Sequence, residues 1–448
     1  MSLMFFPRGG SSQVARYVAR ALPGAGWDVT LVAGSLGAEG EASHAGSFFA
    51  GVEDVRAVDY TAARDAPDPL AADPPFQPSF EDRADAPDRV FAAVDDEAYE
   101  RLVSTWERVL GEAGAADADV LHLHHLTPMN EAAARAFPDV PVVGHLHGTE
   151  LLMLNAISDG PPQGWDFAEA WASRMRGWAQ RCERLLVLSP DAVERVPSLL
   201  GVEASRVVWA PNGFEPDLFD RRPRSGSDRM ALWRRWLVEE PRGWDPSSQE
   251  PGSVRYSEED IEVLGGTVLV YSGRYTEVKR IPLLIKAFAR ASFDGPAGLV
   301  LLGGYPGEWE GEHPLDVVRS VGASGVFLAG WRGHDELADG LNAADAVVLP
   351  SVHEQFGQVL VEGMACGLPC VAVDAHGPAT IVDDGETGWL VPPDDEDALV
   401  AALEEVVNEP AERRRRGEAA YRVARERYSW PALVEKLAAV YEEVRAGS

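Results

Sequence analysis

Two glutamates eight residues apart carry the strongest chemical signal in the sequence. Within residues 351–363, a predicted strand runs into a loop that carries Glu354 and then into a predicted helix that carries Glu362. The loop carboxylate can accept hydrogen bonds from sugar hydroxyls, and the helical one can hold the vicinal diol of a ribose. The turn at Phe356-Gly357 bares backbone N–H groups at the helix N-terminus, which is an anion site. Helix capping explains most isolated glutamate pairs, but it does not account for the Phe-Gly turn between these two.

A basic loop offers the groups that neutralise a pyrophosphate. Residues 272–280 follow a predicted strand and open a helix, and they contain Arg274 and Lys279. The planar guanidinium of arginine and the compact charge of lysine are well suited to phosphate oxygens. A solvated loop with charges at a helix end is the alternative. Because the chain has only three lysines and one of them stands here, the sequence favours a ligand-binding role.

Glycines and histidines in the N-terminal half are weaker signals. Gly10 lies in the first strand-to-helix turn, but the Gly-x-Gly-x-x-Gly fingerprint is missing, which argues against a nicotinamide enzyme. His122, His124 and His125 follow one predicted strand and residues 145–150 follow the next, so both groups can line a ligand cleft. Their spacing is not that of a zinc site, and we expect no metal ion.

Strand and helix patterns alternate in two runs. Helices are predicted at 13–22, 97–113, 168–181, 282–291, 334–343, 358–365 and 430–445. Strands are predicted at 3–6, 28–33, 120–123, 140–145, 184–188, 268–271, 299–302, 326–328, 346–349 and 370–373. Apolar strands that alternate with helices predict an α/β protein with two doubly wound parallel-sheet domains. Ligands of such folds bind beyond the carboxyl ends of the strands, so the cleft between the domains is the expected site.

The predicted domain boundaries follow from where this alternation stops and restarts. The N-terminal domain is predicted at 1–212, a linker or insertion at 213–260 and the C-terminal domain at 261–428. A helix at 429–448 is expected to pack back on the N-terminal domain. Residues 62–88 are rich in proline, aspartate and alanine, which predicts a long solvated loop.

The composition excludes several classes of protein. The 448 residues carry 72 acidic and 40 basic side chains, a formal net charge of −32, with no basic stripe for nucleic acid. No stretch approaches the roughly 18 consecutive apolar residues that a membrane span needs, and we expect no signal peptide. Three cysteines do not form a disulfide framework, so a cytoplasmic location is the default.

Taken in order, these motifs resemble the large family of retaining nucleotide-sugar glycosyltransferases that includes sucrose-phosphate synthases and the glycosyltransferases of mycothiol and bacillithiol biosynthesis. The resemblance covers nearly the whole chain. Besides the motifs above, it includes residues 211–214 (Pro-Asn-Gly-Phe) with Phe219, and residues 383–391. It implies the GT-B fold, in which two Rossmann-like domains face a cleft and the C-terminal domain holds most of the nucleotide.

The resemblance also implies roles for individual residues. Glu354 would contact the hydroxyls of the donor sugar, and His147 would contact that sugar or the acceptor. Arg274 and Lys279 would neutralise the leaving diphosphate, so that neither a metal ion nor a cofactor is expected. The donor site would comprise Gly10, Gly330, Trp331, Phe356, Gly357, Gln358, Val359 and Glu362, and the acceptor site would comprise His125, Thr149 and Glu150.

The expected activity is the retaining transfer of a hexosyl group from a nucleotide diphosphate sugar to a hydroxyl of a small soluble acceptor. The first 210 residues carry a net charge of −15 and no lysine, so an anionic membrane would repel them. The exception is an arginine cluster, expected on one helix, that could favour a lipid acceptor: Arg174, Arg176, Arg181 and Arg184. A nucleotide-sugar epimerase, a lipid-acceptor transferase, a phosphorylase-like enzyme and a binding protein without activity are the alternatives.

Overall fold

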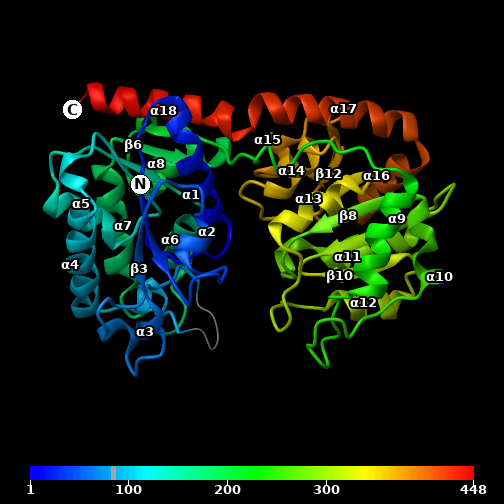
Figure 1. Cartoon of the computed structure of the whole chain (residues 1–448), viewed down its shortest axis with the longest axis horizontal. Helices are drawn as coiled ribbons and strands as arrows, with labels where there is room; N and C mark the ends of the chain where they lie inside the picture. Colours follow the sequence, from blue (N-terminus) through cyan, green and yellow to red (C-terminus); the bar gives the residue numbers. More distant parts are fainter. Residues whose placement is uncertain (82–86, 448) are drawn as a thin grey trace. The chain divides into compact units, whose positions relative to one another are not determined.

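The computed structural model describes residues 1–81 and 87–447, which fold as two compact units (Figure 1). The first unit comprises Met1–Asn212 together with the C-terminal segment that begins at Trp430. The second unit comprises Gly213–Ser429. Each unit is built around its own parallel sheet.

The first unit contains a seven-stranded parallel sheet in the order β3-β2-β1-β4-β5-β6-β7. The chain starts at the centre of this sheet and winds first to one edge and then to the other, as in doubly wound folds. This sheet confirms the α/β class predicted for the N-terminal half. Its strands are β1 (Ser2–Leu3), β2 (Thr30–Ser35), β3 (Asp54–Asp59), β4 (Leu121–His124), β5 (Val142–His145), β6 (Arg184–Val187) and β7 (Val207–Trp209).

Helices cover the sheet of the first unit, and the C-terminal helix is one of them. Trp430 of this helix stacks on Tyr17 with ring centroids 6.0 Å apart, and Leu437 and Tyr441 join the same buried cluster. The C-terminal helix therefore packs against α1. The helices of this unit are α1 (Gly10–Ala21), α2 (Ala45–Phe48), α3 (Thr61–Arg64), α4 (Asp96–Glu112), α5 (Pro128–Ala136), α6 (Thr149–Asp159), α7 (Ala168–Arg181), α8 (Pro190–Leu200) and α18 (Trp430–Ala446).

The second unit contains a six-stranded parallel sheet in the order β10-β9-β8-β11-β12-β13. The strands are almost entirely buried, which explains why they are continuous apolar runs in the sequence. They are β8 (Thr267–Ser272), β9 (Ala297–Leu302), β10 (Val326–Gly330), β11 (Ala346–Leu349), β12 (Cys370–Val373) and β13 (Gly388–Val391). Because the neighbouring strands are parallel, the loops that follow β8, β9, β10 and β11 leave the same edge of the sheet.

The helices of the second unit include two that form the walls of the candidate site, α13 and α14. In order they are α9 (Gly226–Arg234), the π-helical turn η6 (Arg235–Glu239), α10 (Glu258–Ile261), α11 (Ile281–Arg290), α12 (Pro314–Val321), α13 (His334–Asn342), α14 (Gln358–Ala365), α15 (Pro378–Ile381), α16 (Glu396–Asn408) and α17 (Pro410–Arg427). Within the described residues, no helix is both long enough and apolar enough to cross a bilayer.

The segment predicted as a linker or insertion at 213–260 is a folded part of the second unit and not a linker. Trp233, Trp236 and Trp244 in this segment are completely buried, and η6 and α9 are folded around them. The indole of Trp236 lies 4.7 Å from the guanidinium of Arg332, and Trp244 donates a hydrogen bond to the carbonyl oxygen of Gly304. The tryptophans that look scattered in the sequence are therefore core anchors of the second unit.

The segment predicted as a solvated loop at 62–88 also differs in part. Leu70, Phe76 and Phe80 are buried in the core of the first unit, and the side chain of Gln77 accepts a hydrogen bond from the backbone N–H of Phe6. Residues 82–86 of this segment lie outside the described residues. A proline-rich composition conceals these aromatic anchors, because apolar residues without periodicity do not predict burial.

Candidate functional site

The basic loop after β8 and the acidic loop after β11 contact each other in the second unit. Strands β8 and β11 are neighbours in the sheet, so both loops leave its carboxyl edge side by side. Lys279 Nζ forms an ion pair with Glu354 Oε2. The structure thereby brings together two predicted catalytic residues that lie 75 positions apart in the sequence.

Arg274 is the second predicted cation of this loop. The phenol of Tyr271 donates a hydrogen bond of 2.9 Å to the carbonyl oxygen of Arg274 and so fixes the loop. Gly273 is required for this contact, because a Cβ at this position would lie 2.6 Å from the phenol oxygen. The Arg274 side chain is exposed and forms no ion pair with any residue that the structure describes. Its guanidinium is thus available to an anionic ligand.

The turn at Phe356-Gly357 leads directly into α14, and both of its residues are buried. Gly357 has φ +101°, in the left-handed region that favours glycine, and it directly precedes the first residue of the helix. The first N–H groups of a helix have no partner inside it and carry the positive end of its dipole. Phe356 and Val359 are buried, with Phe356 packed against Tyr428, so these two can contribute to a ligand site only through the backbone.

Glu362, the predicted ribose ligand, is held in place by two side chains. Its carboxylate is 2% exposed, and its Oε1 lies 2.9 Å from His334 Nε2 and 3.2 Å from Gln358 Nε2. Gln358 also donates a hydrogen bond of 2.7 Å to the carbonyl oxygen of Gly213. A carboxylate fixed in this way keeps a defined orientation. His334 was not predicted from the sequence, where its position at the start of a helix is the only signal.

Two exposed aromatic residues stand at the carboxyl ends of β9 and β10. Trp331, a predicted donor residue, is 50% exposed, and Tyr305, which was not predicted, is 57% exposed. Their ring centroids lie 6.2 Å apart in an edge-to-face arrangement. Gly330 has φ +71°, and a Cβ there would lie 2.1 Å from the carbonyl oxygen of Arg242, so only glycine fits. Large exposed aromatic residues at a ligand-facing edge are typical of binding surfaces.

The predicted acceptor residues lie together in the first unit, around the N-terminus of α6. Glu150 is fully buried, and its Oε1 lies 2.9 Å from His125 Nδ1. The same carboxylate accepts hydrogen bonds from the backbone N–H of His147 and the hydroxyl of Thr149. Burial by itself would raise the pKa of Glu150, but the charge and hydrogen bond of His125 outweigh this and lower it. The buried carboxylate of Glu150 therefore holds this loop together through its hydrogen bonds.

His147 and Gly10 are the remaining predicted residues of the first unit. His147 is half-buried, and its Nε2 lies 2.9 Å from His124 Nδ1. Burial, with added repulsion from His125 and His145, holds the pKa of His147 well below its usual range. Gly10 is the first residue of α1 and is exposed, and a Cβ there would have no atom within 4 Å. Its side of the turn is therefore open.

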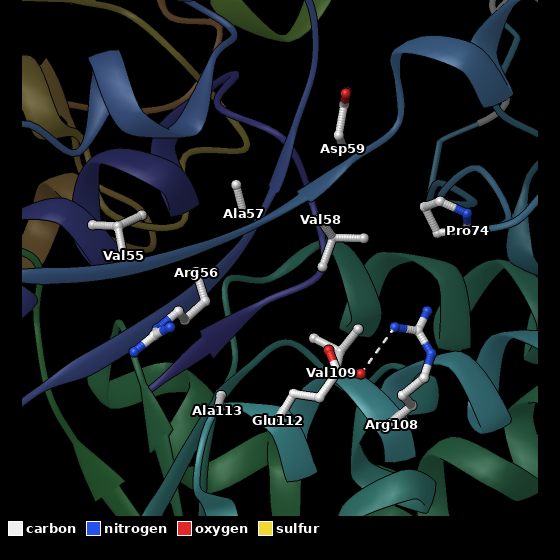
Figure 2. A pocket seen from close by; sticks show the side chains of 10 residues that line it. All are labelled: Val55, Arg56, Ala57, Val58, Asp59, Pro74, Arg108, Val109, Glu112 and Ala113. Carbon is white, nitrogen blue, oxygen red and sulfur yellow. Dashed lines mark hydrogen bonds and ion pairs between the residues drawn. The ribbon is translucent and has the colours of Figure 1, made fainter.

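A hollow of about 420 Å³ beside the edge strand β3 contains none of the predicted residues (Figure 2). Arg56 and Arg108 line it, but each arginine is paired with an acid: Arg56 with Asp54, and Arg108 with Glu112. Both arginines of this hollow are paired, whereas the loop after β8 carries Arg274, which has no ion pair among the described residues.

Comparison with known proteins identifies the family of both halves of the chain. The family "Glycosyl transferases group 1" matches residues 257–423, and "Glycosyltransferase Family 4" matches residues 8–218. The D-inositol 3-phosphate glycosyltransferase of Nocardiopsis dassonvillei is 34% identical over 340 residues, which are 73% of this chain and 71% of that protein. The protein of the same name from Stackebrandtia nassauensis is 31% identical over 72% of this chain and 68% of that protein.

Other curated relatives are matched over a smaller part of their length. The matches cover 66% of the D-inositol 3-phosphate glycosyltransferase of Kineococcus radiotolerans, at 30% identity, and 47% of the protein of the same name from Corynebacterium diphtheriae, at 34% identity. The chain thus spans between about half and two thirds of these two relatives.

Solved structures support the fold. Sucrose-phosphate synthase from Thermosynechococcus elongatus superimposes with a TM-score of 0.65 at 18% identity, covering 100% of this chain and 96% of that one. HepE from Anabaena, solved in complex with UDP and glucose, gives a TM-score of 0.65 at 18% identity, with 98% of both chains covered. These likenesses confirm the predicted GT-B architecture of two parallel-sheet units. The chain therefore belongs to the GT-B glycosyltransferase family defined by these relatives.

Proposed function

We propose that this protein transfers a hexosyl group, with retention of anomeric configuration, from a nucleotide diphosphate sugar to a hydroxyl of a small soluble acceptor. The observation that carries the proposal is the contact between the loops after β8 and β11. In this contact Lys279 forms an ion pair with Glu354. The exposed Arg274 of the same basic loop has no ion pair among the described residues. Two cations and a helix N-terminus at one sheet edge match the charge of a diphosphate.

The chemistry follows from what each group stabilises. Arg274 and Lys279 neutralise the negative charge that develops on the diphosphate as the glycosidic bond breaks, with N–H groups at the start of α14 as further donors. Glu354 accepts hydrogen bonds from the donor sugar, and Glu362 holds the ribose. Retention requires the acceptor hydroxyl to attack on the face from which the diphosphate leaves. No divalent cation is required, because the charge is met by side chains.

The acceptor is assigned to the residues around the N-terminus of α6. We infer that the half-buried His147 and Thr149 of the first unit contact it, that the buried His125 and Glu150 hold their loop in place, and that the acceptor is small and hydroxylated. The names of the matched D-inositol 3-phosphate glycosyltransferases support an acceptor of this size and polarity. The experiments below identify the base and the sugar of the donor.

The arginine cluster that could have favoured a lipid acceptor is largely neutralised. Arg174 and Arg181 on α7 pair with Asp96 and Glu131. Arg184 lies in β6 rather than on the helix where it was expected, and it pairs with Glu443. The fourth member, Arg176, donates to the carbonyl oxygen of Leu199. Paired arginines offer little free charge to an anionic leaflet.

Four measurements test the proposal. A thermal-shift panel of uridine, guanosine and adenosine diphosphates identifies the base, because a ligand at 100 times its dissociation constant stabilises the fold by about 2.7 kcal/mol. Release of the matching diphosphate from nucleotide sugars with inositol-type acceptors then reports transfer. NMR of the product gives the anomeric configuration, and equal rates with and without added Mg²⁺ support metal independence. An inverted product would overturn the retaining mechanism. No stabilisation by any diphosphate would overturn the assignment of a nucleotide diphosphate sugar as donor.

The choice of acceptor class has its own test. Flotation with anionic liposomes at low salt should leave most of the protein at the bottom of the gradient. If most of it rises with the lipid, the acceptor is lipid-linked and the small-molecule assignment is wrong.

A further inference from the structure

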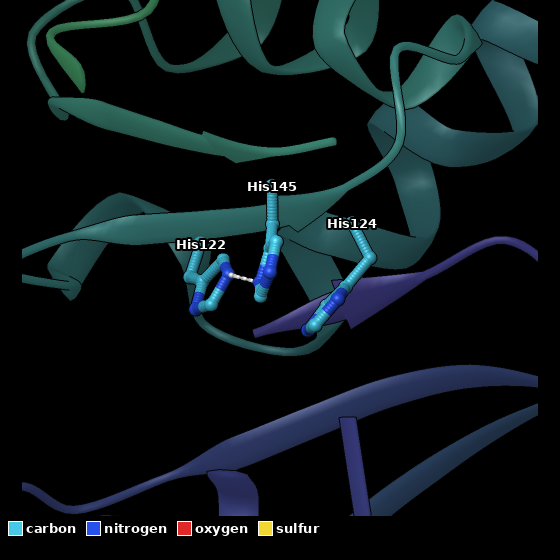
Figure 3. Close-up of side chains that lie close together, drawn as sticks. All are labelled: His122, His124 and His145. Carbon is cyan, nitrogen blue, oxygen red and sulfur yellow. Dashed lines mark hydrogen bonds between the residues drawn. The ribbon is translucent and has the colours of Figure 1, made fainter. Parts of the chain in front are cut away.

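Three histidines form a buried group on one face of the sheet of the first unit (Figure 3). His122 and His124 lie two residues apart on β4, so their side chains point to the same face of the sheet. His145 of β5 is the register partner of His124. All three are at most 3% exposed. The sequence spacing did not predict a metal site here, because the third histidine comes from a different strand.

The ring nitrogens of these histidines are spaced like the ligands of one metal ion. One nitrogen from each of the three rings lies within 4.8 Å of the other two. His122 Nε2 and His145 Nδ1 are 3.2 Å apart. Two nitrogens bound to a tetrahedral zinc ion at about 2.0–2.1 Å are separated by about 3.3 Å. The observed spacing therefore needs little adjustment for this pair.

The outer nitrogens of two of the rings are held by other side chains. His122 Nδ1 is hydrogen-bonded to the phenol of Tyr441 on α18, and His124 Nδ1 to His147 Nε2. Histidines that bind metals nearly always have their second nitrogen fixed in this way, which orients the ring. By contrast, the Nε2 atom of His124 is buried and has no hydrogen-bond partner among the described residues. Unsatisfied buried polar atoms are costly unless a ligand meets them.

The donor set consists of three imidazoles. An imidazole binds a metal through a nitrogen that carries no hydrogen, so the hydrogen shared between His122 Nε2 and His145 Nδ1 moves to the outer nitrogen of one of these rings when the ion binds. Three nitrogen donors without a carboxylate do not suit Mg²⁺ or Ca²⁺, which take oxygen ligands, whereas they suit Zn²⁺.

We propose that His122, His124 and His145 bind one Zn²⁺ ion, which links β4 to β5 and, through Tyr441, to α18. A cavity of about 360 Å³ that includes His122 and Tyr441 in its lining gives the ion a route to the site. Asp28 and Asp119 also line this cavity and place negative charge along the route. The ion is expected to stabilise the fold, because three metal–nitrogen bonds inside the core replace the one hydrogen bond between His122 and His145, with a water molecule from the cavity as the fourth ligand.

The test uses the full chain, stripped of metal by a chelator and then titrated with Co²⁺ and Zn²⁺. We expect one Co²⁺ per chain with the visible absorption bands of a tetrahedral nitrogen-bound ion, and loss of these bands when Zn²⁺ is added. We also expect Zn²⁺ but not Mg²⁺ to raise the Tm. If the wild-type protein shows no such bands, or binds Mg²⁺ with the same effect, the proposal is wrong, whatever the behaviour of variants.

Variants locate the ion. His124→Gln and His145→Gln should each weaken Zn²⁺ binding by at least about 100-fold, and Tyr441→Phe, which removes only the outer hydrogen bond of His122, by about 10–100-fold. His353→Gln is the control, because His353 lies near His376 on the second unit and could bind metal adventitiously. Cobalt bands that persist in both glutamine variants, or that vanish with His353→Gln, would overturn the assignment. Should one buried variant fail to fold, the other and Tyr441→Phe still decide.

Discussion

Lys279 and Glu354 form an ion pair across two loops of the second unit, although 75 positions separate them in the chain. Both side chains are less than one-fifth exposed, so the contact is partly shielded from solvent. The pairing fixes the lysine before any donor arrives, and a diphosphate would then find a cation whose position is already set. Such preorganisation is the main reason why electrostatic groups accelerate reactions.

Removing either cation should slow transfer while leaving the fold intact. Lys279→Ala and Arg274→Ala are each expected to lower kcat by about 10²–10³-fold, the usual effect of losing one preorganised charge-stabilising group. Steady-state rates and thermal unfolding check this. Lys286→Ala is the matched control, since it removes a lysine of the same unit that lies on α11, outside the proposed donor site. Wild-type rates in either loop variant would remove the diphosphate assignment.

A binding experiment should distinguish the roles of Glu354 and Glu362. Glu362→Gln is expected to weaken the binding of a nucleoside diphosphate, because Glu362 holds the ribose. Glu354→Gln keeps an oxygen that can accept a hydrogen bond from Lys279, so it is expected to leave that affinity nearly unchanged and to slow transfer, because a diphosphate carries no donor sugar. Isothermal titration of the diphosphate alone distinguishes the two. An equal loss of affinity in both variants would contradict the division of roles.

How much of the fold and of the candidate site could be predicted from the sequence depended on the burial of each element and on how far apart contacting residues lie along the chain. Strands β11 and β12 and helices α7 and α14 were predicted with their observed bounds or within one residue of them, because they are apolar runs or have clear helical spacing. Strand β3 was missed, because an edge strand with alternating charged residues does not look like a buried strand. Contacts between distant segments have no local signal. The pairing of Glu362 with His334 is an example, since His334 begins a different helix.

The buried tryptophans of residues 213–260 give a stability prediction. Trp236 is fully buried, and its ring would lie 2.9 Å from a Cβ placed at Gly340, so the packing leaves no space. Trp236→Ala should lower the free energy of unfolding by about 3–5 kcal/mol, measured by urea denaturation. Trp209→Ala is the control, because Trp209 is 44% exposed, and its loss should cost about 1 kcal/mol or less. A loss of only about 1 kcal/mol in Trp236→Ala, no larger than that expected for an exposed residue, would mean that this tryptophan does not anchor the core.

His334 is expected to act on the nucleotide through Glu362. Its Nε2 lies 2.9 Å from a carboxylate that is almost completely buried, and hydrogen bonds to charged groups contribute about 1.5–3 kcal/mol. His334→Ala should therefore raise the dissociation constant of the nucleoside diphosphate by about tenfold or more.

The conservative variant His334→Gln distinguishes a role of His334 in positioning Glu362 from a role in supporting the fold. His334→Gln keeps a nitrogen donor that can reach the carboxylate, so it should restore most of the affinity that His334→Ala loses. The KM for the donor should rise in the alanine variant while the KM for the acceptor stays constant, since only the ribose contact is loosened. If the glutamine variant is as weak as the alanine variant, or if both KM values rise together, His334 supports the fold rather than the ribose ligand.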